Sequence, residues 1–409
     1  MTTATPFSRP LYVTLKPVGA HCNLACKYCY YLEKQQLYAD HTRHIMDDEM
    51  LERFTREYIE AQSTAEVLFV WHGGEPLMRP IEFYKRAIEL QRRYAGPRLI
   101  NNCIQTNGTL INDEWARFFR ANGWLVGVSI DGEQDFHDEY RKTHTGQGSW
   151  QKVMRGIRTL QRHGVEWNAM AVVNDYNSGY PLDFYRFFKQ IGCRYLQFTP
   201  VVERLVSHSD GRYLAHPADA GAPLASFSVD PDMWGQFLCD IFDEWVRTDV
   251  GTVFVEQFDC TLANWIGENP GICVYGRECG HAGVMEYNGD VYSCDHFVFP
   301  EYRLGNIRTS TITEMLYGEK QGRFSLLKHK SLPQECLDCT WEFACHGECP
   351  KNRFVTDRYG NPGMNYLCRG YRRYFEHVAP YMEYMKHLLS QHRPPADIME
   401  ALRTGAFRP

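Results

Sequence analysis

The sequence His21-Cys-Asn-Leu-Ala-Cys-Lys-Tyr-Cys-Tyr30 is the stretch from which the fold and the chemistry of this chain can be worked out. It follows a short β-rich run at Leu11–Leu15, so it forms the loop at the carboxyl end of the first predicted strand. The loop presents the thiols of Cys22, Cys26 and Cys29. A 4Fe–4S cubane usually takes four cysteines, so three thiolates would leave one iron open for a ligand. The competing interpretation is a closed zinc site, with the histidine that begins the stretch as the fourth ligand.

Strand-like and helix-like stretches alternate from this loop onward. The β-rich runs are Leu11–Leu15, Val67–Trp71, Asn102–Thr106, Leu125–Ile130, Asn168–Val173 and Tyr195–Thr199. The amphipathic runs between them are Asp47–Gln62, Ile81–Tyr94, Asp113–Asn122, Trp150–His163 and Leu182–Ile191. Strands that alternate with helices predict an α/β fold, here a partial (β/α)6 TIM-like barrel with a parallel sheet. Functional side chains of such barrels collect at the carboxyl ends of the strands.

The composition is that of a large folded protein. The chain has 409 residues, of which 44% are hydrophobic and 23% charged, and its formal net charge is −6. No block of Lys and Arg indicates a nucleic-acid footprint, and no apolar run approaches the roughly 20 residues of a membrane span. The first ten residues lack the charged and apolar regions of a secretory signal. We therefore expect a cytoplasmic protein, in which fifteen cysteines indicate metal binding or catalysis more than disulfides.

The pattern changes after the sixth predicted strand. Residues 201–229 are polar and are predicted to form a long loop or insertion, and residues 233–250 an amphipathic helix. A hairpin signal follows at Asn288-Gly289-Asp290, and a final aromatic helix is predicted over residues 366–392. We predict two domains, namely a barrel at residues 1–240 and a cysteine-rich domain with a C-terminal helix at residues 241–409.

Eight further cysteines lie in the second half of the chain. They are Cys273, Cys279, Cys294, Cys336, Cys339, Cys345, Cys349 and Cys368. Eight thiols suffice for two four-cysteine sites, and spacing alone leaves open whether these hold zinc or iron–sulfur clusters and how the cysteines pair. The other four lie in apolar stretches and are predicted to be buried as small hydrophobic side chains: Cys103, Cys193, Cys239 and Cys260.

The Cys-x3-Cys-x2-Cys spacing after the first strand of a βα repeat resembles the signature of the radical S-adenosylmethionine (SAM) superfamily. In that family the open iron binds SAM, and reductive cleavage gives a 5′-deoxyadenosyl radical that removes a hydrogen atom from carbon. His72-Gly-Gly-Glu-Pro76, Ser129-Ile-Asp-Gly132 and His137-Asp-x-x-Arg141 are similar to further motifs of the family, and the glycines let the backbone approach a ligand closely. The resemblance implies SAM contacts by Tyr28, Gly74, Glu75, Ser129, Arg141 and Leu196.

The spacing of the later cysteines resembles the SPASM extension of radical SAM proteins, which holds two auxiliary 4Fe–4S clusters. The resemblance assigns Cys273, Cys279, Cys294 and Cys349 to one cluster, and Cys336, Cys339, Cys345 and Cys368 to the other. The cofactors that it implies are three 4Fe–4S clusters and SAM.

Almost the whole chain resembles the anaerobic sulfatase-maturating enzymes. Matching stretches include Gln105-Thr-Asn-Gly-Thr-Leu110, Asp290-Val-Tyr-Ser-Cys-Asp295 and Asn365-Tyr-x-Cys368. These enzymes oxidise a Cys or Ser in a Cys/Ser-x-Pro/Ala-x-Arg motif of a sulfatase to Cα-formylglycine. The resemblance implies that the radical abstracts a Cβ hydrogen, that Asp295 takes the thiol or hydroxyl proton, and that an auxiliary cluster accepts an electron. The implied partners are a flexible or unfolded sulfatase segment and an electron donor such as flavodoxin or ferredoxin.

Two alternatives remain at this point. Another SPASM peptide maturase, one that forms thioether or carbon–carbon crosslinks, would share all the clusters. The ten or so residues before the first strand leave no room for the separate peptide-recognition domain that would favour it. A non-catalytic zinc-binding protein would be colourless and free of iron. From the residues alone, Asp295 could also be a solvated loop carboxylate.

Overall fold

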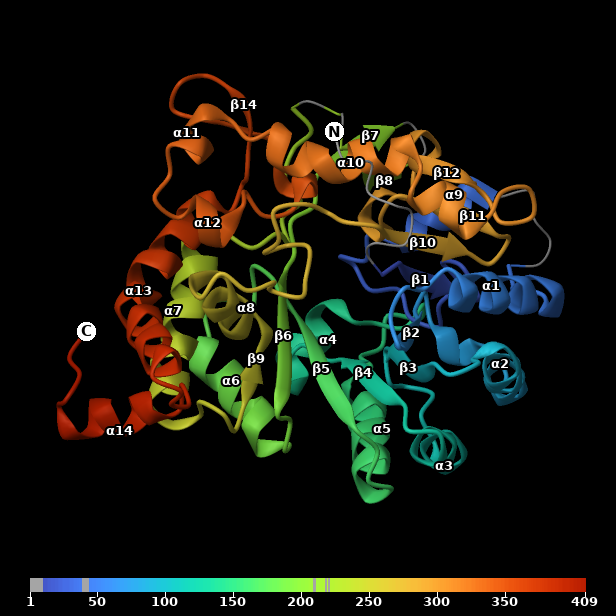
Figure 1. Cartoon of the computed structure of the whole chain (residues 1–409), viewed down its shortest axis with the longest axis horizontal. Coiled ribbons are helices and arrows are strands. Elements are labelled where there is room, and N and C mark those ends of the chain that lie inside the picture. The colour runs from blue at the N-terminus through green and yellow to red at the C-terminus, as the bar shows by residue number, and fades with distance from the viewer. Residues whose placement is uncertain (1–9, 39–43, 209–210, 218, 220) are drawn as a thin grey trace. The chain divides into compact units, whose positions relative to one another are not determined.

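The computed structural model describes residues 10–38, 44–208, 211–217, 219 and 221–409, and it shows an α/β protein (Figure 1). The chain folds into two compact units, each assembled from separate stretches of sequence. The first unit comprises residues 1–129, 137–167 and 280–326, and the second residues 130–136, 168–279 and 327–409. The predicted division between residues 240 and 241 is a different partition, and it stays a prediction. The first nine residues, on which the secretory-signal argument rests, lie outside the described part.

The first unit is built on a mostly parallel sheet, in the order β12-β11-β10-β1-β2-β3-β4. Its strands are β1 (Tyr12–Lys16), β2 (Glu66–Trp71), β3 (Leu99–Thr106), β4 (Leu125–Ser129), β10 (Ala282–Glu286), β11 (Asp290–Tyr292) and β12 (Arg303–Asn306). From β10 to β4 the neighbouring strands pair in parallel, whereas β10, β11 and β12 pair antiparallel. The register of β1 and β10 sets Lys16 beside Glu286, although 269 positions separate them in the chain.

Helices follow the strands of the first unit. They are α1 (Asp48–Glu60), α2 (Ile81–Tyr94), α3 (Asp113–Ala121), α5 (Trp150–Arg162) and α9 (Ile312–Leu316), with the 3-10 turns η1 (Leu32–Tyr38), η2 (Pro76–Met78), η3 (Asp295–Phe297) and η4 (Pro300–Tyr302). Two more, α4 (Gln134–Tyr140) and α10 (Glu319–Lys330), contain residues of both units. The carboxylate of Asp47 caps α1 by accepting the N–H of Met50 at 2.7 Å. Trp71 of β2 packs edge-on against Tyr84 of α2 and stacks on Trp124, which closes the core between sheet and helices.

The second unit has three parallel strands, β5 (Trp167–Val173, except for its first residue), β6 (Tyr195–Pro200) and β9 (Phe254–Val255). Its helices are α6 (Pro181–Gln190), α7 (Pro231–Thr248), α8 (Glu256–Trp265), α11 (Gln334–Leu337), α12 (Glu342–Cys345), α13 (Cys368–Ser390) and α14 (Asp397–Thr404). The remaining elements are η5 (Pro350–Asn352) and the short strands β7 (Leu205–His208), β8 (Gly211–Leu214), β13 (Val355–Thr356) and β14 (Pro362–Met364). The helices α7 and α13 cross at Gly235 and Gly370, where a Cβ on Gly370 would lie 2.1 Å from the carbonyl oxygen of Pro231.

The predicted elements of the first half agree with the observed ones to within about three residues at each end, and the α/β class with a parallel sheet is confirmed. The predicted hairpin is the β10–β11 connection, and the two late helices are α7 and α13. The prediction of a loop over residues 201–229 is wrong in part, because β7 and β8 pair there. Residues 209, 210, 218 and 220 of that stretch lie outside the described part.

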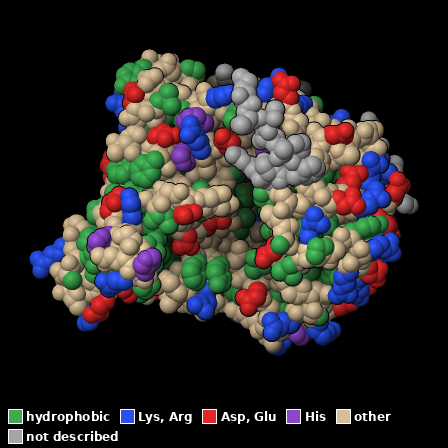
Figure 2. Space-filling view, in the orientation of Figure 1, with side chains coloured by type: hydrophobic (Ala, Val, Ile, Leu, Met, Phe, Trp, Pro, Cys, Tyr) green, Lys and Arg blue, Asp and Glu red, His purple; other side chains and the backbone are tan. Residues whose placement is uncertain are grey.

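The surface agrees with the charge pattern. Figure 2 shows Lys and Arg side chains interspersed with Asp and Glu on the face drawn, and not gathered into one basic stripe. None of the described helices is long and apolar enough to cross a bilayer.

Candidate active site

The loop that carries the first three cysteines follows β1 in the first unit, and hydrogen-bond donors surround its thiols. The Cys22 thiol accepts the N–H of Leu24 at 3.4 Å and the Nδ2 of Asn107 at 3.7 Å. Burial raises the pKa of Cys22 to about 12, and these donors oppose the shift. Burial also raises the pKa of Cys29, whose charge acts on Cys22. Clustered thiols with N–H donors aimed at sulfur fit a metal cluster, which would bind them as thiolates.

The loop after β2 packs directly onto the start of this cysteine loop. The N–H of Gly74 donates to the carbonyl of Gly19 at 2.8 Å, and the N–H of Glu75 donates to that of His21 at 2.9 Å. A Cβ on Gly74 would lie 2.1 Å from the His21 oxygen. From the sequence, a glycine at this position is expected to let the backbone approach a ligand closely. In the structure the protein's own backbone, one residue before Cys22, already requires it.

Glu75 is fully buried, and its carboxylate is engaged by the chain itself. It accepts hydrogen bonds from the Oγ1 of Thr106 at 2.7 Å, the N–H of Leu77 at 2.9 Å and the N–H of Asn107 at 2.7 Å. Burial raises the pKa of Glu75 to about 7, and these donors oppose the shift. The side chain therefore ties the loop after β2 to the carboxyl end of β3. A direct contact with SAM, like that of Gly74, stays a prediction.

The other residues assigned to SAM occupy different places. Ser129 ends β4, and its Oγ accepts the Nε2 of Gln105 at 2.9 Å. The guanidinium of Arg141 lies over the ring of Tyr28, 5.5 Å from its centroid. Leu196 is the second residue of β6, near the amino end of that strand, and is 3% exposed. The rule that function collects at carboxyl ends accounts for Ser129 but not for Leu196.

Asp295 lies in a buried polar network of the first unit. Its Oδ1 forms an ion pair of 2.6 Å with the Nζ of Lys16, which ends β1 and is fully buried. The hydroxyl of Tyr30, from the cysteine loop, donates to the other carboxylate oxygen. The Nδ1 of His72 lies 3.4 Å from the same Lys16 Nζ. Burial alone would raise the pKa of Asp295, but the charge of Lys16, with smaller effects of His72 and His296, holds it below its usual value. Asp295 is therefore a partly exposed carboxylate in its ionised form.

A second layer supports this pair. The ammonium of Lys16 lies 3.9 Å from the ring centroid of Tyr31, whose hydroxyl donates to Glu286. Burial raises the pKa of Glu286 to about 7. Burial and the charge of Lys16 lower the pKa of His72 to about 4. Lys16, Tyr30 and Glu286 were not predicted as site residues. The one signal in the sequence is a lysine that ends an apolar strand just before the cysteine loop.

Four later cysteines come together in the second unit. One cavity is lined by Cys336, Cys339, Cys345 and Cys368. In the same unit, burial raises the pKa of Cys349, and the charges of Glu348, Cys273 and Cys279 add to the shift. None of the fifteen cysteines forms a disulfide, and Cys193, Cys239 and Cys260 are buried as predicted, whereas Cys103 is only partly so. Cys294 belongs to the first unit, and its grouping with Cys273, Cys279 and Cys349 stays a prediction.

Two family models match the chain. The radical SAM superfamily matches residues 17–188, and the iron–sulfur cluster-binding domain SPASM matches residues 277–340. The serine-type anaerobic sulfatase-maturating enzyme of Bacteroides thetaiotaomicron is 62% identical over 409 residues, which cover 100% of this chain and 99% of that relative. The cysteine-type enzyme of Clostridium perfringens strain 13 is 31% identical over 374 residues, which cover 91% and 97%.

The solved structure described as native anSMEcpe with bound AdoMet aligns with a TM-score of 0.80 at 30% identity, covering 92% of this chain and 100% of that one. The fold, the cysteine loop and these similarities agree. The chain belongs to the anaerobic sulfatase-maturating enzymes, which are radical SAM enzymes.

Proposed function

We propose that this enzyme oxidises a serine in a Cys/Ser-x-Pro/Ala-x-Arg motif of a sulfatase to Cα-formylglycine. The observation that carries the proposal is the buried Lys16–Asp295 ion pair, which the Tyr30 hydroxyl links to the cysteine loop. The preference for serine over cysteine rests on similarity. The relative that is 62% identical is named a serine-type enzyme, whereas the cysteine-type relatives are 31–33% identical.

Three sets of thiols would hold three 4Fe–4S clusters, the first on Cys22, Cys26 and Cys29. The resemblance groups the others as Cys273, Cys279, Cys294 and Cys349, and as Cys336, Cys339, Cys345 and Cys368. When bound, the clusters and SAM supply the 5′-deoxyadenosyl radical and an acceptor for the second electron. Electrons would enter from a small donor protein such as flavodoxin or ferredoxin.

A residue of the chain itself accepts the proton from the substrate hydroxyl. Oxidation of the serine hydroxyl to an aldehyde removes one hydrogen atom from Cβ, one proton from Oγ and one electron. Asp295 accepts the proton, because Lys16 keeps its carboxylate ionised before the substrate arrives. Tyr30 donates to the second carboxylate oxygen and so orients the first one.

The burial of this pair serves the same step. Lys16 is fully buried and Asp295 is 25% exposed, so the carboxylate is open on one side while its counter-ion is sealed from water. A base held in this way needs little solvent reorganisation when it takes a proton. The geometry thus suits a single proton acceptor with one accessible face.

The test compares two synthetic peptides that differ only in Ser or Cys at the target position, under anaerobic turnover. We expect both to yield the aldehyde in step with 5′-deoxyadenosine, with the higher kcat/KM for the serine peptide. The Asp295→Asn variant should lose about 10²- to 10⁴-fold in kcat, which is the usual contribution of a general base. Formation of 5′-deoxyadenosine with both peptides unchanged would refute sulfatase-type oxidation. A wild-type rate for Asp295→Asn would remove Asp295 from the role of base.

A further inference from the structure

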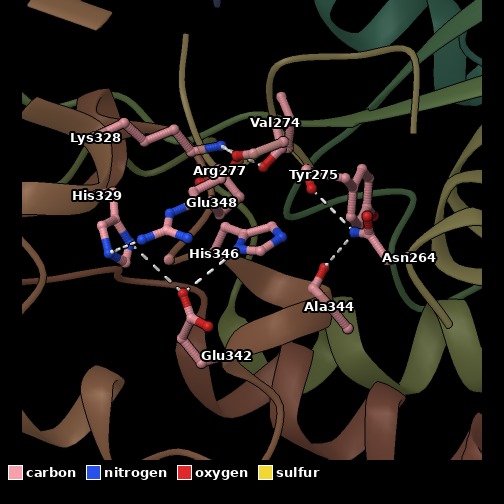
Figure 3. A network of polar contacts seen from close by, with 12 residues as sticks. Asn264, Val274, Tyr275, Arg277, Lys328, His329, Glu342, Ala344, His346 and Glu348 are labelled. Carbon is pink, nitrogen blue, oxygen red and sulfur yellow. Dashed lines mark hydrogen bonds and ion pairs between the residues drawn. The ribbon is translucent and has the colours of Figure 1, made fainter. Parts of the chain in front are cut away.

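Lys328 is a buried lysine of the second unit that the proposed reaction does not use. It lies near the end of α10, and its Nζ donates to the backbone carbonyls of Cys273, Val274 and Gly276, the second at 2.8 Å (Figure 3). An ammonium has three N–H donors, and here each one has a carbonyl acceptor. Lysines are almost never fully buried without such partners. The side chain therefore holds the loop that carries Cys273 and brings a positive charge with it.

The charge of Lys328 acts on three thiols. Its ammonium interacts electrostatically with Cys279, Cys273 and Cys349. The nearby carboxylate of Glu348 is also buried, and the Nδ2 of Asn352 donates to it at 3.1 Å.

The surrounding side chains hold the backbone of the same region through hydrogen bonds. Arg353 donates to the carbonyls of Gly347 at 2.8 Å and Glu348 at 3.1 Å. Asn264 bridges the carbonyls of Tyr275 and Ala344 at 2.9 and 3.0 Å (Figure 3). Two cations act on the thiols of this set: the charge of Lys328 acts on Cys273, Cys279 and Cys349, and that of Arg353 acts on Cys279 and Cys349.

The other four-cysteine set has a different charge environment. The charge of Arg372 acts on Cys368 there, but its guanidinium is paired with Glu335 at 2.8 Å. Arg358 pairs with the same carboxylate at 2.8 Å. The guanidinium of Arg372 is thus paired directly with a carboxylate, whereas the ammonium of Lys328 donates to backbone carbonyls and has the Glu348 carboxylate nearby.

We propose that Lys328 is a positioning residue that raises the reduction potential of the cluster held by Cys273, Cys279 and Cys349, and so makes it the acceptor of the substrate electron. This inference rests on the proposed function. A cluster gains one negative charge when it accepts one electron, so a buried cation stabilises its reduced form more than its oxidised form. The electron comes from the substrate Cβ radical, which also loses its Oγ proton to Asp295 as the aldehyde forms.

The test is a potentiometric titration of the anaerobically reconstituted holoenzyme, followed by electron paramagnetic resonance. Lys328→Gln keeps an N–H donor and removes the charge. We expect the reduced-to-oxidised ratio of one cluster to fall at least tenfold at a given potential, which is about 59 mV for a one-electron couple. Lys330→Met is the matched control, because Lys330 is exposed two positions later on the same helix, and it should titrate like the wild type. The yield of aldehyde per 5′-deoxyadenosine should fall in Lys328→Gln alone.

An unchanged midpoint potential in Lys328→Gln, at full iron content, would overturn the proposal. If that variant loses iron, the same titration of the Lys328→Arg variant tests the proposal. Full iron content with a wild-type midpoint in Lys328→Arg supports the role of the charge, and any other result overturns it. The titration needs no peptide, so a failure of the wild type to oxidise either peptide refutes the proposed function without altering what the titration says of Lys328.

Discussion

Replacing Lys16 with methionine removes the cation that faces Asp295 while keeping a side chain of similar length. At an effective dielectric constant of about 20, unit charges 2.6 Å apart attract by roughly 6 kcal/mol, most of which offsets the cost of burying both charges. Loss of one partner of a buried pair costs about 3–5 kcal/mol. Because Asp295 is 25% exposed, we expect the lower end of that range. A loss of about 3 kcal/mol lowers Tm by roughly 6–12 °C in a unit of this size.

The assay is anaerobic thermal unfolding of the reconstituted enzyme, arranged as a double-mutant cycle. Lys16→Met leaves a carboxylate without its counter-ion, whereas Lys16→Met combined with Asp295→Asn removes both charges. The double variant should therefore be more stable than the sum of the single changes predicts, by at least about 1 kcal/mol. Lys85→Met is the control, since Lys85 is 52% exposed and its loss should change stability by less than about 0.5 kcal/mol. Additivity within about 0.5 kcal/mol would refute the coupling of Lys16 and Asp295.

Three further predictions concern packing and pH. Gly74→Ala places a Cβ 2.1 Å from the carbonyl oxygen of His21, so the amount of iron bound after reconstitution should fall. Gly322→Ala is the control, because its Cβ enters open space and the variant should bind iron normally. Equal iron contents in the two variants would contradict this prediction. Gly370→Ala in α13 places a Cβ 2.1 Å from a carbonyl oxygen of α7, so Tm should drop by several degrees. An unchanged Tm would show that α7 and α13 can move apart without a cost in stability. Burial, and then the charge of Asp259, raises the pKa of Glu256 from 4.5 to about 7. The folded-state pKa exceeds the unfolded one, so the stabilising contribution of Glu256 is present below pH 4.5 and is lost as the pH rises to about 7. Glu256→Gln should thus raise the free energy of unfolding by up to about 3 kcal/mol at pH 8 and by much less at pH 5, which is measured as a larger increase in Tm at pH 8. An equal effect at both pH values would contradict the shift.

Most strands and helices could be predicted from the local pattern of apolar residues. The first-half strands and helices could be predicted because each buries one face, and the period of apolar residues reports that face directly. The pairing of β10 with β1 could not be predicted, because nothing in a local pattern identifies a partner 270 positions away. The strand β9, with two residues, is too short to carry a period, and the hairpin of β7 and β8 lies in a polar stretch that reads as a loop.

Likewise, some residues of the candidate site could be predicted from the sequence and others could not. The cysteine loop could be predicted because its spacing is local and its chemistry needs thiols. Lys16 could not be predicted as a site residue, because a lysine at the end of a strand is usually exposed to solvent. Only the register of β1 with β10 and the hairpin that follows β10 bring Asp295 close to it. Gly74 was predicted to allow the close approach of a ligand. The structure shows that the backbone of His21 occupies the space that a Cβ on this residue would need.

The most direct test of the central claim uses a serine peptide carrying deuterium at the target Cβ. Under anaerobic turnover the account predicts one deuterium transferred into 5′-deoxyadenosine for each peptide that loses one deuterium from Cβ and one hydrogen from Oγ. The Asp295→Asn variant should still label 5′-deoxyadenosine while forming much less aldehyde. Aldehyde formation without deuterium in 5′-deoxyadenosine would contradict the claim that oxidation begins at Cβ of the substrate serine.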